Sequence, residues 1–164
     1  MSPSEGRDSG TGKALDGSGL KIGVACARWN GEVTDLLLEG ALGRLAALGV
    51  EPADVRTMVV PGSFELPLAA QVLATTGGVD AVVCLGAVIR GETSHYDLVA
   101  GECAAGLQRV QLDTGVPVVF GVLTTENLEQ ALERSGGRHG HKGEEAAETA
   151  VEMARLLKSV RADG

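Results

Sequence analysis

The sequence predicts a three-layer α/β/α sandwich built around a parallel sheet of four strands. Apolar segments of strand length alternate along the chain with helical repeats of about ten residues or more. Connections of that length cross over the sheet, which makes successive strands parallel and places helices on both faces. Ligands of such sheets bind beyond the carboxyl ends of the strands, so the turns that follow the strands are the expected location of a site.

The expected strands are apolar runs that end in glycine, proline or polar residues. The run at residues 81–85 contains no polar side chain, which is typical of a strand buried on both faces. We expect this strand to break at Gly86. The other expected strands lie at residues 20–27, 55–60 and 117–123.

Each expected helix has an apolar stripe and a recognisable end. The first, at residues 33–48, stops at Gly49, because glycine readily adopts the left-handed conformation that ends a helix. The second carries Pro67 in its first turn, where proline is tolerated, and stops at Gly77 and Gly78.

The third helix restarts after a glycine turn and reaches about residue 113. Ser94 and Asp97 fit a helix-start box at its beginning. Thr124 or Thr125 would cap a fourth helix of about ten residues that ends near Arg134. Residues 135–143 are expected to form a Gly-rich loop, and a last helix reaches about residue 160.

Composition limits the class of protein. The chain of 164 residues is long enough for one domain with a hydrophobic core. Its formal net charge of −8 argues against a nucleic-acid partner and is explained simply by solubility. No apolar run approaches the ~20 residues that span a membrane. Cys26, Cys84 and Cys103 lie in apolar runs without metal spacing, which favours buried, reduced thiols in a cytoplasmic protein.

The chain is expected to form one domain with short tails. Residues 1–19 are rich in glycine, serine and aspartate and poor in apolar side chains, which is typical of a flexible tail. The domain is expected at residues 20–160, and residues 161–164 form a short C-terminal tail. We see neither an internal repeat nor a second domain.

Three turns are expected to meet at the carboxyl edge of the sheet, namely residues 28–30, 61–65 and 86–93. The last of them nearly matches the nucleotide-triphosphate loop G-x-x-x-x-G-K-[ST]. Glu92 occupies the lysine position, and a carboxylate there repels a triphosphate, which argues against an NTPase. A smaller phosphate could still bind the N–H and hydroxyl of Thr93, although a plain helix cap also explains the spacing.

Several side chains in these turns suit ligand chemistry, and each also has a structural explanation. His95 can exchange a proton near neutral pH, or it is a surface histidine in a first helical turn. Trp29 directly follows a strand and could stack on a flat heterocycle, or it packs in the core. Ser63 and Glu65 could bind hydroxyls or ring nitrogens, or they cap a helix and offset its dipole.

Arg134 and Lys142 are the basic residues whose positions say most about where an anion could bind. A helix of about ten residues rises roughly 15 Å, so Arg134 is expected at the opposite edge of the sheet from the three turns. An anion held by Arg134 would then lie in the crevice of a neighbouring copy, which implies a ring of subunits. Lys142 lies at a helix start, where Glu144 and Glu145 offset its charge. His139 is followed two residues later by a histidine without a third ligand nearby, so no metal site is expected.

The chain resembles the lumazine synthase family, the 6,7-dimethyl-8-ribityllumazine synthases of riboflavin biosynthesis. The resemblance covers about residues 20–160, and its motifs occur in order and at compatible spacing. They are Arg28-Trp29-Asn30, Pro61-Gly62-Ser63-Phe64-Glu65, Gly86 to Asp97, Phe120-Gly121-Val122-Leu123-Thr124, Glu133-Arg134 and His141-Lys142-Gly143.

The resemblance implies a flavodoxin-like fold and a condensation of 5-amino-6-(D-ribitylamino)uracil with 3,4-dihydroxy-2-butanone 4-phosphate. It implies no metal or redox cofactor, and a homopentamer or larger shell with sites between adjacent subunits. Trp29 would stack on the pyrimidine, His95 would be the acid/base, and Arg134 would bind the phosphate, with Lys142 nearby.

The resemblance implies further substrate contacts: Ser63, Phe64 and Glu65 at the ribityl chain, Ala87, Val88 and Ile89 around the pyrimidine, Glu92 and Thr93 at the phosphate, and Phe120 over the ring. Two alternatives remain on the same fold. One is a lumazine or flavin carrier without activity, and the other is a shell-forming scaffold.

Overall fold

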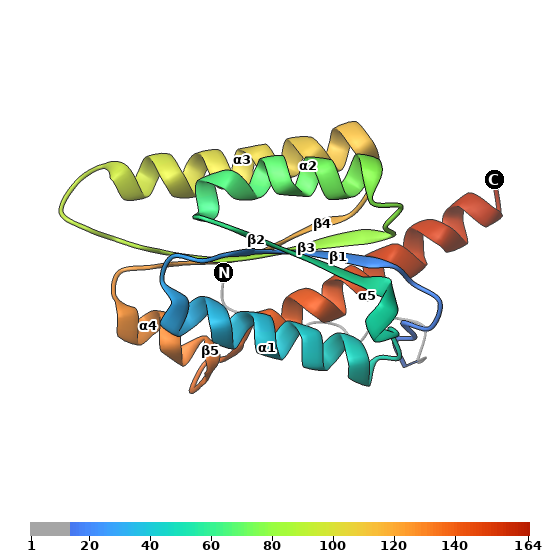
Figure 1. Cartoon of the computed structure of the whole chain (residues 1–164), viewed down its shortest axis with the longest axis horizontal. Helices are drawn as coiled ribbons and strands as arrows, with labels where there is room; N and C mark the ends of the chain where they lie inside the picture. The colour runs from blue at the N-terminus through green and yellow to red at the C-terminus, as the bar shows by residue number, and fades with distance from the viewer. Residues whose placement is uncertain (1–13) are drawn as a thin grey trace.

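The computed structural model describes residues 14–164 and contains a parallel sheet with the strand order β2-β1-β3-β4 (Figure 1). The register is parallel throughout, with Ile22 opposite both Val55 and Ala81. The strands are β1 (Ile22–Ala27), β2 (Val55–Val60), β3 (Ala81–Ile89) and β4 (Val118–Thr125). β2 and β4 are therefore the two edge strands.

Helices cover both faces of this sheet, which confirms the predicted three-layer α/β/α sandwich (Figure 1). α2 (Leu66–Thr76) and α3 (His95–Thr114) form one layer, and α1 (Gly31–Ala47) and α5 (Lys142–Ala162) form the other. The short α4 (Leu128–Glu133) lies with α1 and α5. Single 3-10 turns, η1 (Pro52–Asp54) and η2 (Ser63–Glu65), precede β2 and α2.

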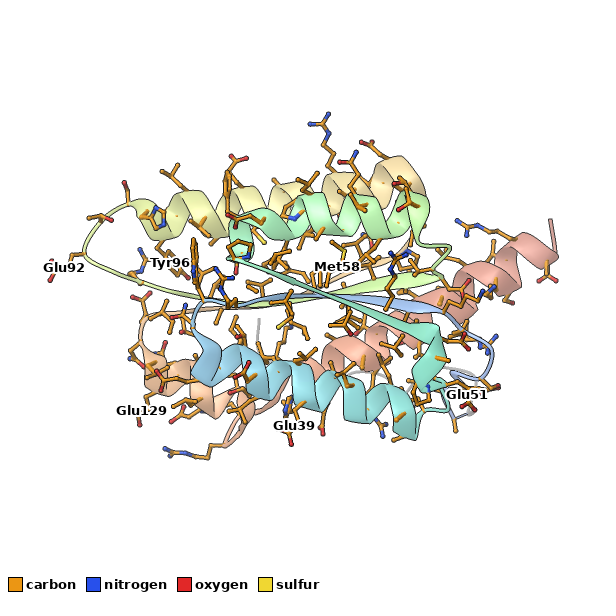
Figure 2. All side chains as sticks on the ribbon, viewed as in Figure 1. Glu39, Glu51, Met58, Glu92, Tyr96 and Glu129 are labelled. Carbon is orange, nitrogen blue, oxygen red and sulfur yellow. The ribbon has the colours of Figure 1, made fainter. Side chains whose placement is uncertain are left out.

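The core consists of two apolar layers that are separated by the sheet. Because side chains alternate along a strand, β3 sends Val83 and Leu85 toward α1 and α5, and Val82 and Cys84 toward α2 and α3. Figure 2 shows Met58 and Tyr96 between the sheet and the α2–α3 layer, while Glu39 and Glu129 point outward. The prediction of buried free thiols is confirmed, because all three cysteines are unpaired and buried.

The third strand is longer than predicted. It passes through Gly86 and ends at Ile89, because Gly86 to Ile89 continue to pair with Val122 to Thr125 of β4. Gly86 has a packing role instead of breaking the strand: a Cβ built there would lie 2.4 Å from Ser63 Oγ. The turn after β3 therefore comprises residues 90–94.

The fourth helix is shorter than predicted and starts later. β4 includes both Thr124 and Thr125, and the helix is capped by Asn127, whose side chain accepts a hydrogen bond from Gln130 N at 2.9 Å. After six helical residues, Ser135 Oγ donates to Ala131 O at 3.0 Å, and the chain turns into a small antiparallel hairpin. The expected loop at 135–143 thus contains β5 (Ser135–Gly137) and β6 (Gly140–His141).

The packed structure extends beyond the predicted domain boundaries. Gly17 is buried and its N–H donates to Leu48 O at 2.7 Å, so the last residues of the predicted tail pack on the domain. Residues 1–13 of that tail lie outside the described residues. α5 ends at Ala162, close to the predicted end at about residue 160. None of the helices between residues 14 and 164 is both long and apolar enough to cross a membrane.

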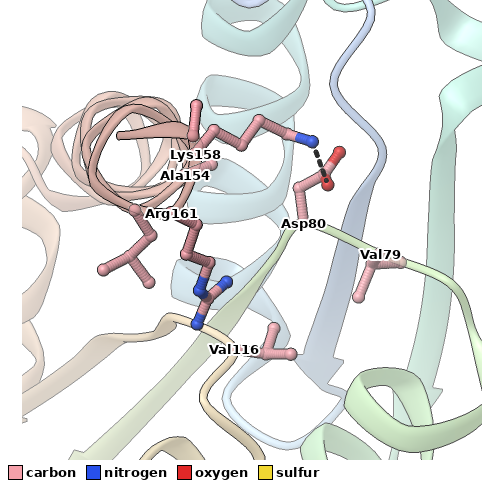
Figure 3. Close-up of a pocket in the computed structure, with 8 residues that line it drawn as sticks. Val79, Asp80, Val116, Ala154, Lys158 and Arg161 are labelled. Atoms are coloured by element: carbon pink, nitrogen blue, oxygen red, sulfur yellow. Dashed lines mark ion pairs between the residues drawn. The ribbon is translucent and has the colours of Figure 1, made fainter. Parts of the chain in front are cut away.

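A cavity of about 360 Å³ lies at the amino-terminal edge of the sheet, opposite the predicted site (Figure 3). Its charged groups already have partners. Lys158 Nζ lies 3.1 Å from Asp80 Oδ1, and the Arg161 guanidinium donates to Gly115 O at 2.9 Å. The Asp80 carboxylate also accepts from Lys21 N at 2.8 Å. These contacts fasten the end of α5 to the sheet.

Candidate active site

The turn after β1 is shaped by Asn30, which adopts the left-handed conformation at φ 61. Asparagine tolerates this conformation better than most residues, and here its side chain donates to Ala87 O of β3 at 2.8 Å. Trp29 N donates to Pro61 O at 2.9 Å. The Asn30 side chain thus joins the end of β1 to the end of β3, and the backbone of Trp29 joins the end of β1 to the end of β2.

The turn after β2 packs closely against Trp29 and against Gly86 of β3. A Cβ built on Gly62 would lie 2.4 Å from Trp29 Cε3, so the indole rests on the bare backbone of Gly62. Ser63 fills the space above Gly86 and is buried. Both contacts require glycine, because a methyl group at either position would displace the side chain above it.

A cavity of about 500 Å³ opens where these turns meet the first turns of α3. It brings together eight of the predicted site residues from four different segments. These are Trp29, Ser63, Phe64, Glu65, Ala87, Val88, Ile89 and His95. Its wall is mostly apolar, and a volume of this size suits a small heterocyclic ligand.

Glu65 provides the strongest sign that this cavity binds a ligand. Its Oε2 atom is buried, and no hydrogen-bond donor among the described residues reaches it. An unpaired buried carboxylate oxygen is costly, since it has lost water without gaining a partner. Donors from a ligand, such as hydroxyl groups, would satisfy it.

His95 enters the cavity as the first residue of α3. Ser94 is the N-cap residue, but it makes no side-chain cap hydrogen bond, so the predicted box is not formed. The His95 N–H instead points to Thr93 Oγ1 at 3.4 Å. Glu92 and Thr93 lie in the exposed loop before His95 and are not among the lining residues of this cavity. In Figure 2, Glu92 lies at the far tip of that loop.

Phe120, Arg134 and Lys142 do not reach this cavity in the same chain. Phe120 lies on the edge strand β4, where it is 37% exposed. Arg134 follows α4, and Lys142 N donates to Arg134 O at 2.8 Å, so the fold holds these two basic residues together.

The predicted reason for the separation of Arg134 was wrong. α4 has six residues, so it rises only about 9 Å and stays near the carboxyl ends of the strands, as Figure 1 shows. Arg134 is kept from the cavity because α4 packs on the α1–α5 side of the sheet, whereas His95 lies on α3 in the other layer.

Four lining residues had no predicted ligand contact of their own: Asn30, Gly62, Leu98 and Val99. Leu98 and Val99 lie three and four positions after His95 and therefore share its helix face, which the helical period could have indicated. Asn30 before a glycine at a strand–helix turn was a recognisable left-handed position.

The chemistry available in the cavity is proton transfer and orientation. His95 is its only imidazole, and the lining contains no cysteine. Burial raises the pKa of Cys26 and of Cys103 to about 11, so these thiols stay protonated and unreactive at neutral pH. An apolar wall with a tryptophan, a carboxylate and a histidine can hold a flat, hydroxyl-bearing ligand and move protons on it.

Comparison with known proteins shows which family the chain belongs to. Residues 19–158 match the family model described as 6,7-dimethyl-8-ribityllumazine synthase. The chain is similar to the proteins of that name from two strains of Thermus thermophilus. Each is 56% identical over 146 residues, which cover 89% of this chain and 93% of the relative. The chain therefore belongs to the 6,7-dimethyl-8-ribityllumazine synthase family.

Proposed function

We propose that this protein condenses 5-amino-6-(D-ribitylamino)uracil with 3,4-dihydroxy-2-butanone 4-phosphate in the cavity beside Trp29. The products are 6,7-dimethyl-8-ribityllumazine, phosphate and water. The single observation that carries the proposal is the unpaired, buried Glu65 Oε2 within a cavity that also holds His95 and the indole. The family of the chain and the names of its relatives support the same reaction.

The pyrimidine substrate fits the part of the cavity that the chain supplies by itself. The exposed indole of Trp29 provides a flat face for the ring, and Ala87, Val88 and Ile89 form an apolar wall at the end of β3. Ribityl hydroxyls can donate to Glu65 and exchange hydrogen bonds with Ser63. Phe64 borders the same end of the cavity and covers the ribityl chain.

The phosphate substrate fits the open end of the cavity. Residues 92–93 lie just before α3, where free backbone N–H groups and the helix dipole attract anions. His95 lies next to that position and can carry a proton from the attacking amine to a leaving oxygen. Binding both substrates in one cavity supplies much of the acceleration, because it replaces an encounter in solution by a fixed geometry.

A neighbouring subunit completes the site in this proposal. The resemblance to this family implies an oligomer, and the cavity of one chain is left open: Trp29 and Phe64 are each 59% exposed. Arg134, Lys142 and Phe120 lie away from the cavity of their own chain. A ring of identical subunits would bring these residues of one copy to the cavity of the next, where Phe120 covers the ring and Arg134 binds the phosphate.

A direct assay tests the reaction. Mixing both substrates with the protein is expected to produce the lumazine, and its formation is monitored by its absorbance. His95→Ala is expected to lower kcat about 100-fold, the low end of the range for acid–base catalysis, without abolishing turnover, since positioning remains. Failure of the wild-type protein to form the lumazine while still binding it would identify a carrier without activity.

A further inference from the structure

Arg90 stands between the cavity wall and the loop that carries His95, but it does not line the cavity. It follows β3 directly, and its backbone N–H donates to Thr125 O at the end of β4 at 2.8 Å. A cationic side chain next to a phosphate position would be expected to bind the phosphate. The contacts of the Arg90 side chain indicate a structural role instead.

The guanidinium of Arg90 is occupied on three sides by this chain. Its Nε lies 3.1 Å from Glu126 Oε1 and 3.0 Å from Oε2. Its Nη1 lies 3.6 Å from Asp97 Oδ1, and its centre lies 4.2 Å from the centroid of the Tyr96 ring. Asp97 and Tyr96 belong to the first turn of α3, whereas Glu126 belongs to the turn after β4.

The loop between Arg90 and His95 has little else to hold it. Residues 91–94 are exposed, and within the described part of the chain the side chains of this loop make one hydrogen bond, the long 3.4 Å contact between Thr93 Oγ1 and His95 N. The location of His95 therefore depends on where α3 begins. Arg90 ties that beginning to the sheet through two side chains of α3.

We propose that Arg90 is a positioning residue, whose guanidinium fastens the first turn of α3 to the turn after β4 and thereby sets the location of His95. We call the contacts among Arg90, Glu126, Asp97 and Tyr96 the latch. The role assigned to His95 rests on the proposed function, whereas the latch itself does not. Because every ion pair in the latch is partly exposed, it contributes little to global stability and acts on local geometry.

The test is a double-mutant cycle between Arg90 and Glu126, measured on kcat/KM for the butanone phosphate. Arg90→Gln and Glu126→Gln are each expected to lower it about tenfold, because small displacements of catalytic groups have large effects on rate. The double variant is expected to be no slower than either single variant, since both changes open the same latch. Arg90→Lys, which keeps the charge without the planar fork, should recover only part of the loss.

A matched control is available on the same helix. Arg109→Gln removes an arginine that lies 3.6 Å from Asp113 on α3, away from the cavity, and should leave the rate unchanged. The affinity for the lumazine product, measured by quenching of Trp29 fluorescence, is expected to be unchanged in all of these variants, because the proposed lumazine contacts lie on β3 and on the turns after β1 and β2, outside the latch.

Amide hydrogen exchange provides a readout that does not depend on activity. Exchange at the first hydrogen-bonded amides of α3, those of Asp97 and Leu98 that donate to Ser94 O, is expected to be faster in Arg90→Gln and Glu126→Gln than in the wild type, and unchanged in Arg109→Gln. Unchanged exchange in both latch variants would overturn the proposal. A low kcat/KM in Arg90→Gln together with a wild-type kcat/KM in Glu126→Gln would also overturn it. That result would mean that Arg90 contacts the substrate itself. If the wild type makes no lumazine but exchange increases as expected, the latch stands and the proposed function fails.

Discussion

Replacing Gly143 with alanine is expected to lower the free energy of unfolding by about 3 kcal/mol, the upper part of the range for overpacked cores. A Cβ at this position would lie 2.2 Å from Leu37 O and 2.9 Å from Leu37 C, both backbone atoms of α1. Backbone atoms within a helix cannot rotate away, so α1 and α5 would have to separate. Both helices contribute to the same buried layer, which makes that separation costly.

Urea unfolding measures this effect, and α1 supplies the matched control. At Gly43 a built Cβ meets no atom within 4 Å. Gly43→Ala is therefore expected to raise the free energy of unfolding by about 0.5–1 kcal/mol, the usual gain from removing glycine from a helix interior. Equal midpoints for the wild type and Gly143→Ala would show that the two helices do not pack as closely as described here.

Replacing Arg134 with alanine is expected to lower kcat/KM for the butanone phosphate about 100-fold, because charge-assisted hydrogen bonds to a phosphate are lost. Within its own chain the Arg134 side chain donates from Nη1 to Gln130 O at 2.9 Å and lies 4.0 Å from Glu133 Oε2, and it is 40% exposed. These weak local contacts leave most of its N–H groups available to a ligand.

Steady-state kinetics with each substrate varied in turn separates the possible roles of Arg134. The loss in Arg134→Ala should appear mainly as a higher KM for the butanone phosphate. The affinity for the lumazine product, which has no phosphate, should be unchanged. Arg134→Lys should recover only part of the loss, since lysine cannot form two parallel hydrogen bonds. An unchanged KM for the butanone phosphate in Arg134→Ala would remove Arg134 from the phosphate site.

The sequence predicted the architecture because strands and crossover helices leave strong periodic signals. The burial of the third strand, the parallel direction of the strands and the position of the cavity at their carboxyl ends were predictable from apolar runs and connection lengths. Trp29 and His95 were identified because they directly follow strands or open a helix there. Local rules were sufficient for these residues.

The errors arose where a contact between distant segments decides the local structure. Gly86 was predicted to break the strand, whereas it stays in β3, where it pairs with Val122 and leaves room for Ser63 Oγ. Similarly, Asn30 had no predicted role of its own, because the hydrogen bond to Ala87 O crosses from one strand end to another. Neither partner can be identified from spacing along the chain.

The region after β4 shows a second kind of error. The predicted helix of about ten residues has only six, because β4 runs through Thr125 and the helix starts at Leu128. Its end at Glu133 lies close to the predicted one, and Gly136 then adopts φ 108. The antiparallel pairing of β5 with β6 is too short to leave a periodic signal. As a result, the location of Arg134 was predicted for the wrong edge of the sheet, although its absence from the cavity of its own chain was predicted correctly.

Mixing two impaired variants shows whether His95 of one subunit and Arg134 of its neighbour form one site. His95→Ala lacks the acid/base, and Arg134→Ala lacks the phosphate contact, so homogeneous oligomers of either variant are expected to be slow. In oligomers formed by unfolding and refolding an equal mixture, about one quarter of the interfaces in a head-to-tail ring pair an intact His95 with an intact Arg134. Activity is therefore expected to recover to about that fraction of the wild-type value. A mixture no more active than its separate components would show that the site is not shared between subunits.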